Sequence, residues 1–241
     1  MTLLLNLYLG HLLGDFVLQP GWLVAAKRRN VWGLLTHVGI IGVCTAIILH
    51  EDISSLWNIV LLAMAAHVAI EVITIRARAS TKLSGLSVFL IDQALHVLSI
   101  VVLVWTASPY VEVDEVAFLG MDVSAAIVAF LCALVATTFM GAVIIFEVVN
   151  SMGPESWNRD ILPYDRARIL GMIERASALA IGVFVNPALI FVPFLPRMAR
   201  AFSRSDDERA QQMIAAATGL VVCVMGWAVV AGVAIASQSM S

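Results

Sequence analysis

The sequence predicts an all-α membrane protein, a polytopic helical bundle with six full spans and one re-entrant or short helical hairpin. The chain of 241 residues is 61% hydrophobic and only 13% charged, with a mean hydropathy of +0.96. An ordinary soluble domain has roughly 25% charged residues. The apolar residues gather in runs of about 20, the length that a helix needs to cross the hydrocarbon core. The basic residues gather in short segments between these runs.

The apolar runs are too long for strands and do not alternate as the strands of a membrane barrel do. The first run differs from a signal peptide, because it lacks a basic leading segment and carries His11 and Asp15. We therefore expect it to stay in the protein as a helix. The six predicted spans are 2–19, 31–49, 56–75, 86–106, 123–149 and 213–236.

A further apolar stretch, 169–198, is too long for one ordinary span and contains Asn186-Pro187 near its middle. Proline removes a backbone donor and disfavours helix in the residue before it. Two short helices that meet at Asn186-Pro187 account for the stretch. We therefore predict a re-entrant or short hairpin here.

The placement of charge orients the chain, because cytoplasmic loops are rich in Lys and Arg. The 14 basic residues fall in the segments 27–29, 76–82, 159–175 and 197–209. All four segments lie on one side only if 169–198 is a hairpin. The other loops carry acids, namely Glu51, Asp52, Glu112, Asp114, Glu115 and Asp122. We expect both termini outside the inner membrane of a bacterium. We also expect a single integral domain, 1–241, with a polar four-helix bundle in 1–106 and the remaining helices in 123–236.

Ionisable side chains inside the bilayer are costly and mark function by default. Four of the five histidines lie in the first four predicted helices, and three of them have a carboxylate four residues away, which places both groups on one helical face. From the 1.5 Å rise per residue we place the whole set roughly 5–15 Å from the cytoplasmic edge. The set comprises His11 with Asp15, His67 with Glu71, Asp92 with His96, and His37, which has no such carboxylate.

These groups are candidate ligands of one or two divalent ions, with zinc, iron and manganese all suited to imidazole and carboxylate. Asp15, Glu71 and Asp92 are also the candidate catalytic carboxylates. A proton relay without metal and purely structural packing between helices stay open as alternatives. Candidate substrate-binding residues are Lys27, Glu147, Glu174 and Arg175. Glu174 and Arg175 either bind an anionic head group or pair with each other.

Several segments together resemble a bacterial multi-pass membrane family catalogued as domain of unknown function 3307 (DUF3307). They are His11-Leu-Leu-Gly-Asp15-Phe-Val-Leu-Gln19, Thr36-His37, His67-Val-Ala-Ile-Glu71 and Phe89-Leu-Ile-Asp92-Gln-Ala-Leu-His96. The segments 169–175 and 197–202 resemble its C-terminal half. The family usually has Asp where this chain has Glu71, and often Lys where it has Thr74. A fainter similarity links the His/Asp pattern to inner-membrane proteins described as metal-dependent hydrolases, which is an analogy of pattern only.

Two main classes of function follow. The first is a metal-dependent hydrolase that acts on a lipid or amphipathic substrate from the cytoplasmic leaflet, with the metal activating water. The second is a transporter or channel for a metal ion or proton. A helper subunit with a structural polar cluster is the third alternative. The expected partner is membrane lipid and not nucleic acid, with a homo-oligomer or a membrane complex left open.

Overall fold

A computed structural model describes residues 1–80, 82–109, 117–121, 123–153 and 162–239. These residues are helical apart from their turns and one isolated bridge between Phe118 and Met121, so the predicted all-α class is confirmed for them. They form two compact units, Met1–Val128 and Ala129–Ser241. The single membrane domain expected from the sequence stays a prediction.

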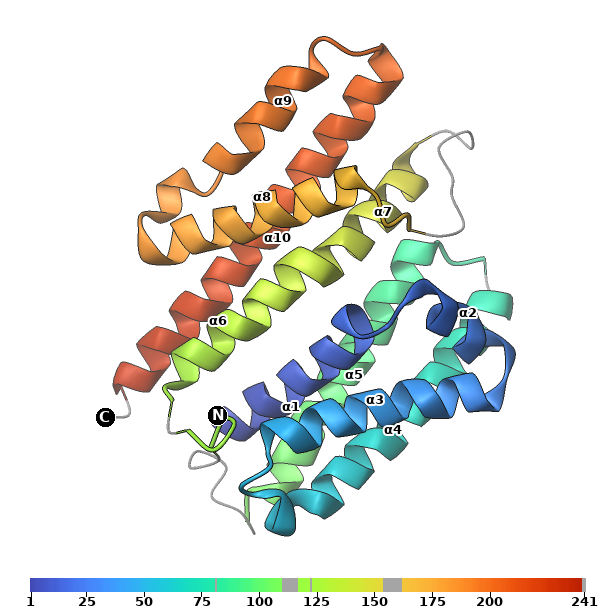
Figure 1. The fold of residues 1–241 in the computed structure, drawn as a ribbon, viewed down its shortest axis with the longest axis vertical. Coiled ribbons are helices and arrows are strands. Elements are labelled where there is room, and N and C mark those ends of the chain that lie inside the picture. The colour runs from blue at the N-terminus through green and yellow to red at the C-terminus, as the bar shows by residue number, and fades with distance from the viewer. Residues whose placement is uncertain (81, 110–116, 122, 154–161, 240–241) are drawn as a thin grey trace. The chain divides into compact units, whose positions relative to one another are not determined.

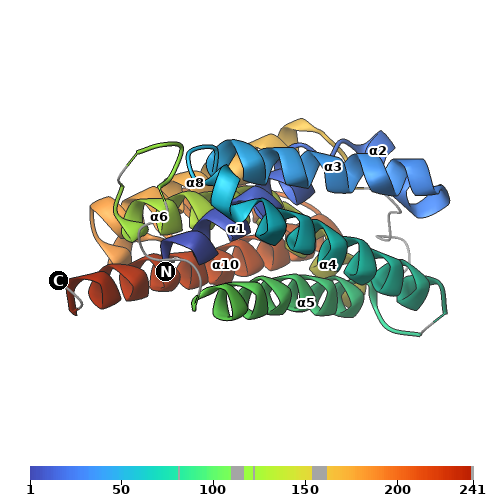
Figure 2. The ribbon, with the colours of Figure 1, turned by 90° about the horizontal axis from the view of Figure 1, so that it is seen from below.

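The first unit is built from four apolar helices that surround a common interior (Figures 1 and 2). They are α1 (Thr2–Leu12), α3 (Val31–Ile48), α4 (Ile53–Ser80) and α5 (Gly85–Ala107). Helices α3 and α5 both pack against α1 and both pack against α4, which closes the ring. Helix α1 continues into a π-helical turn, η1 (Leu13–Val17), a type of turn that is frequent at functional sites.

Two glycines allow α1 and α3 to approach closely. A Cβ atom added at Gly10 would lie 3.0 Å from the Thr45 Cα, and one added at Gly14 would lie 2.9 Å from the Ile41 Cα. Small residues at such positions let membrane helices pack backbone to backbone. This close approach brings η1 against α3, and with it Asp15 against His37.

A short helix that the sequence analysis did not predict, α2 (Gly21–Arg29), joins η1 to α3 and packs against α3. Helix α2 begins after Pro20 and ends before Asn30. The Asn30 side chain caps the next helix, α3, because it accepts a hydrogen bond from the Gly33 backbone N–H at 2.7 Å. The nine residues of α2 are too few and too polar for a span. From the sequence, its basic end was expected to be a loop that orients the chain, with Lys27 also a candidate for substrate binding.

Five described helices are long and apolar enough to cross a membrane: Val31–Ile48, Ile53–Ser80, Gly85–Ala107, Ala125–Met152 and Asp206–Ser239. The first run forms a shorter apolar helix, Thr2–Val17, so six spans and two outer termini stay predictions. Several helices pass the predicted ends because backbone hydrogen bonding continues into the polar residues that flank a span. Residues Glu112, Asp114, Glu115, Asp122 and Arg159, used to orient the chain, lie outside the described residues.

The second unit contains most of a long apolar helix with a π-helical turn in its middle, formed by α6 (Ala125–Val135), η2 (Ala136–Met140) and α7 (Gly141–Met152). Helix α8 (Arg166–Phe184) packs against η2 and against α10 (Asp206–Ser239). These contacts define the interior of this unit.

The predicted break at Asn186-Pro187 is confirmed, because α8 ends at Phe184 and the Asn186 side chain accepts a hydrogen bond from the Ala188 backbone N–H at 2.8 Å. The second arm differs from a regular helix. It consists of two 3-10 turns, η4 (Pro187–Leu189) and η5 (Val192–Phe194), and the seven-residue α9 (Leu195–Ala201). A proline lies at the start of each, and its missing N–H interrupts continuous helical bonding.

Candidate metal centre

The interior of the first unit brings together all seven residues that the sequence analysis singled out as ligands. They come from α1 (His11), η1 (Asp15), α3 (His37), α4 (His67, Glu71) and α5 (Asp92, His96). Six of the seven are buried, and Asp92 is half-buried. Their chemical roles stay predictions, but the four helices place them in one cluster.

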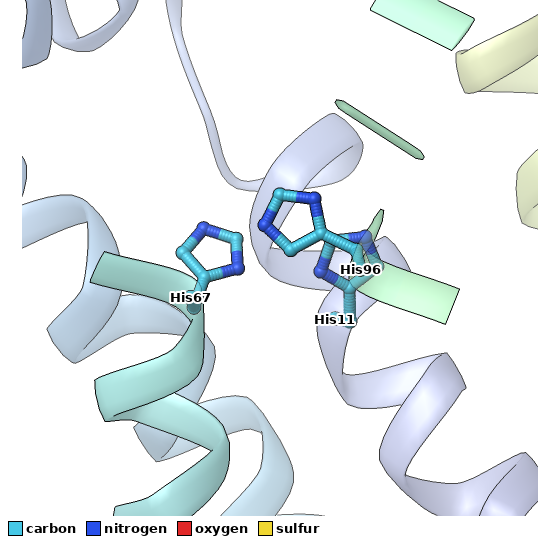
Figure 3. A group of neighbouring side chains, drawn as sticks. All are labelled: His11, His67 and His96. Carbon is cyan, nitrogen blue, oxygen red and sulfur yellow. The ribbon is translucent and has the colours of Figure 1, made fainter. Parts of the chain in front are cut away.

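Three imidazoles, His11, His67 and His96, lie side by side and come from three different helices (Figure 3). The ring centroids are 4.2 Å apart for His67 and His96, 4.6 Å for His11 and His96, and 5.4 Å for His11 and His67. One ring nitrogen of each lies within 4.8 Å of the others, so the three could hold a metal ion.

A second group, which we call the four-donor group, consists of Asp15, His37, His67 and Glu71. The His37 Nε2 lies 3.0 Å from the Asp15 Oδ1 and 3.0 Å from the His67 Nε2. It also lies 3.4 Å from the Glu71 Oε1. The His67 Nε2 lies 3.6 Å from the Asp15 Oδ1 and 3.8 Å from the Glu71 Oε1. Tetrahedral ligands at about 2.0–2.1 Å from a zinc ion are roughly 3.3 Å apart, so these distances bracket a tetrahedral site.

The clusters share ligands. His67 belongs to the three-histidine group and to the four-donor group, and Asp15 also belongs to a third group with Asp92 and His96. The donors therefore suffice for one ion or for two, as the sequence analysis left open.

His37 has no carboxylate four residues away on its own helix, but two carboxylates from other elements lie beside its ring. Asp15 comes from η1 and Glu71 from α4. Sequence spacing reveals partners only within one helix. The central position of His37 follows from the packing of α1 and α4 on either side of α3.

Lys27 also lies in the cluster. Its ammonium group forms an ion pair with the Glu71 carboxylate, and its Nζ lies 3.4 Å from the His37 Nε2. The ammonium group lies against the buried candidate ligands, with 11% of the side chain exposed. Helix α2 is the element that brings it there. The role of Lys27 in binding an anionic substrate stays a prediction.

Two glutamines that the sequence analysis did not select orient these groups. With its amide oxygen toward His37 and Lys27, Gln19 accepts from the His37 Nδ1 at 2.7 Å and from the Lys27 Nζ at 3.0 Å. This places the His37 proton on Nδ1 and leaves the Nε2 lone pair facing the other donors, the arrangement that a metal ligand needs. Gln93 donates to the Asp92 Oδ2 at 3.0 Å. For Gln19, the sequence signal that could have revealed this role is its spacing, because it follows Asp15 by four residues.

His96 is oriented by its own helix. Its Nδ1 donates to the Asp92 backbone carbonyl at 2.9 Å, so its Nε2 carries the lone pair. That Nε2 and the Asp92 Oδ1 are buried atoms with no hydrogen-bond partner among the described residues. Most buried polar atoms in proteins have a partner, so both atoms have the capacity to bind one more ligand.

A cavity of about 20 Å³ adjoins the three histidines, with Thr45 and Ser99 as its hydroxyl-bearing lining residues. A cavity of roughly 10–15 Å³ suffices for one water molecule. The cluster therefore has room beside it for a water molecule.

The other predicted binding residues lie in the second unit, Glu147 on α7 and Glu174 and Arg175 on α8. Glu174 pairs with Arg197, with the Arg197 Nε 2.7 Å from the Glu174 Oε2, and not with Arg175. Their role in substrate binding stays a prediction.

The family described as "Protein of unknown function (DUF3307)" matches residues 3–125. The chain belongs to this family. The DUF3307 match covers nearly the whole first unit and includes all seven candidate ligands, so the resemblance of the N-terminal segments is confirmed. The resemblance of segments 169–175 and 197–202, which lie outside the match, stays a prediction. No curated protein and no solved structure matches the chain. These comparisons show no hydrolase relative for this DUF3307 protein.

Proposed function

We propose that this DUF3307 protein binds a divalent metal ion inside the membrane, at the four-donor group. The observation that carries the proposal is the spacing of the donor atoms. His37 Nε2, His67 Nε2, Asp15 Oδ1 and Glu71 Oε1 come from three elements, and the five separations given above run from 3.0 to 3.8 Å. The three carboxylates of the cluster, Asp15, Glu71 and Asp92, together balance a divalent cation and the Lys27 ammonium, which offsets the cost of holding the ion in an apolar bundle.

The donor set supports zinc, iron or manganese, since two imidazoles and two carboxylates suit all three. Hydrogen bonds to the ligands support the same proposal. Gln19 directs the Nε2 of His37 toward the other donors, and metal-bound histidines nearly always have such a partner on the other ring nitrogen.

We further propose that the ion serves hydrolysis of a lipid or amphipathic substrate at the cytoplasmic leaflet of a bacterial inner membrane. A bound metal ion supplies an activated water molecule and polarises a phosphoryl or acyl oxygen. Asp92 is the member of the cluster with the most exposed side chain, 16%, and its Oδ1 has no partner among the described residues. It is therefore the carboxylate best placed to accept a proton from water.

Transport of a metal ion or proton is the second candidate, and the cavity beside the histidines favours it. The lining residues Thr45 and Ser99 lie toward the end of the bundle away from α2, beyond His37 and His96 along their helices. The cavity thus extends the polar groups along the bundle axis, as a conduction path needs.

Metal analysis of the purified protein in detergent tests the binding proposal. We expect about one or two zinc, iron or manganese ions per chain, lost in His37→Ala and in Glu71→Ala. His50→Ala is the matched control, because His50 pairs with Glu51 in an exposed loop. A protein that retains no metal after dialysis against a micromolar excess of each ion refutes the proposal.

Two assays separate the finer alternatives once metal binding is established. Release of product from phospholipids in mixed micelles, lost in Asp92→Asn with the metal retained, supports hydrolysis. Metal or proton flux into liposomes, reduced when Ser99→Leu fills the cavity, supports transport. The absence of product release together with measurable flux refutes the hydrolase.

A further inference from the structure

A second polar cluster lies in the interior of the second unit, around Arg175 of α8. Arg175 is 4% exposed. Its Nε donates to the Thr137 carbonyl at 2.7 Å and its Nη2 donates to the Thr138 carbonyl at 2.8 Å. Both carbonyls belong to the π-helical η2. These bonds hold the guanidinium in a fixed orientation, and Arg175 has no carboxylate partner among the described residues.

Arg197 of α9 is held in a similar way. Its Nε donates to the Glu174 Oε2 at 2.7 Å, and its Nη1 donates to the Gln212 Oε1 at 3.1 Å. In each arginine, two of the three guanidinium nitrogens are therefore bonded within the protein. The third, Arg175 Nη1 or Arg197 Nη2, has no acceptor among the described residues.

The two remaining nitrogens converge on the same backbone position, Gly171. A Cβ atom added there would lie 3.1 Å from the Arg175 Nη1 and 3.1 Å from the Arg197 Nη2. The two nitrogens are thus no farther apart than twice that distance. Because residue 171 is a glycine, no side chain stands at this position, whereas any larger residue would place its Cβ against both nitrogens.

The local charge is positive, because Arg175 and Arg197 face only one carboxylate, that of Glu174. Arg168, one turn before Gly171 on α8, adds a third guanidinium, whose buried Nε has no hydrogen-bond partner in the part of the chain that the structure describes. Two cations held this close repel each other unless an anion lies between them. Guanidinium groups bind oxyanions through short, charge-assisted hydrogen bonds.

We propose that Arg175 Nη1 and Arg197 Nη2, above the bare backbone of Gly171, form a binding site for a phosphate group. The phosphate belongs either to a phospholipid head group or to a free phosphate ion. The proposal does not depend on the metal centre, since all its residues belong to the second unit.

Binding to the full-length protein in a non-ionic detergent tests this site, with dioctanoyl phosphatidic acid, inorganic phosphate and uncharged dioctanoylglycerol as probes. We expect phosphatidic acid to bind and dioctanoylglycerol not to bind, as measured by native mass spectrometry or calorimetry. Binding of inorganic phosphate as well supports a free phosphate as ligand, and binding of the lipid alone supports a head group. A protein that binds neither phosphate probe refutes the site.

Gly171→Ala is the sharpest variant, because it keeps every charge and alanine is a better helix former than glycine. We expect it to weaken phosphate binding at least tenfold, since its Cβ lies against both nitrogens. Arg197→Gln should weaken binding to a similar degree. Arg204→Gln is the matched control, because Arg204 pairs with Glu208 on the surface, 61% exposed. Unchanged affinity in Gly171→Ala, or an equal loss in Arg204→Gln, overturns the proposed geometry.

Discussion

Replacement of Gly14 by alanine probes the contact that brings Asp15 to His37. The new Cβ would lie 2.9 Å from the Ile41 Cα and 3.1 Å from the Ile41 Cβ. Carbon atoms in contact settle at roughly 3.5–4.0 Å, so η1 must move away from α3 by about 0.5–1 Å. A gap of that size removes roughly a quarter to a half of the dispersion energy at the contact.

The expected loss of stability follows from two opposing effects. Overpacking a tight interface costs about 1–3 kcal/mol, and the better helix propensity of alanine recovers at most about 1 kcal/mol. A net loss of about 1–2 kcal/mol lowers the Tm by roughly 2–8 °C in a chain of this size. The same movement lengthens the 3.0 Å separation between the Asp15 Oδ1 and the His37 Nε2, so we expect metal affinity to fall at least tenfold.

The chain offers both an assay and a control. Its three cysteines are buried, so a thiol-reactive fluorophore reports unfolding in detergent as they become accessible. Gly39 lies on α3, and a Cβ atom there meets nothing within 4 Å. Gly39→Ala should therefore keep or raise the Tm and keep metal binding. If Gly14→Ala matches Gly39→Ala in Tm and in metal affinity, the close approach does not position the site.

Three further predictions follow from the metal centre and the hairpin. Lys27→Met leaves the buried Glu71 carboxylate without its ion pair, which costs about 3–5 kcal/mol in the metal-free protein. The Tm of the metal-free variant should therefore be lower, and added zinc should raise its Tm by more than it raises the Tm of the unaltered protein. An equal rise in Tm on addition of zinc would contradict this prediction. Zinc at about 100 times its Kd should stabilise the unaltered protein by about 2.7 kcal/mol and raise the Tm by roughly 5–10 °C, an increase that His67→Ala should lack. Asn186→Ala removes the cap on the Ala188 N–H and should lower the Tm by roughly 2–4 °C with metal content unchanged, whereas loss of metal would link the hairpin to the centre.

The sequence alone predicted the helical class, the break at Asn186-Pro187 and the seven candidate ligands that the first unit brings together. Apolar runs and proline act locally, so composition and order suffice to locate helices and their interruption. The scarcity of charge within the apolar runs singled out residues such as Asp15 and His67, because few ionisable groups are tolerated there without a function.

Only the tertiary structure decided which of these groups share an ion site and which residues support them. His37 gains its carboxylates from other helices, Lys27 reaches the cluster from the unpredicted α2, and Arg175 and Arg197 meet at Gly171. Periodicity along one helix describes one face of that helix. The close approach of α1 and α3 and the fold of the hairpin determine which faces meet, and they depend on packing between distant parts of the chain.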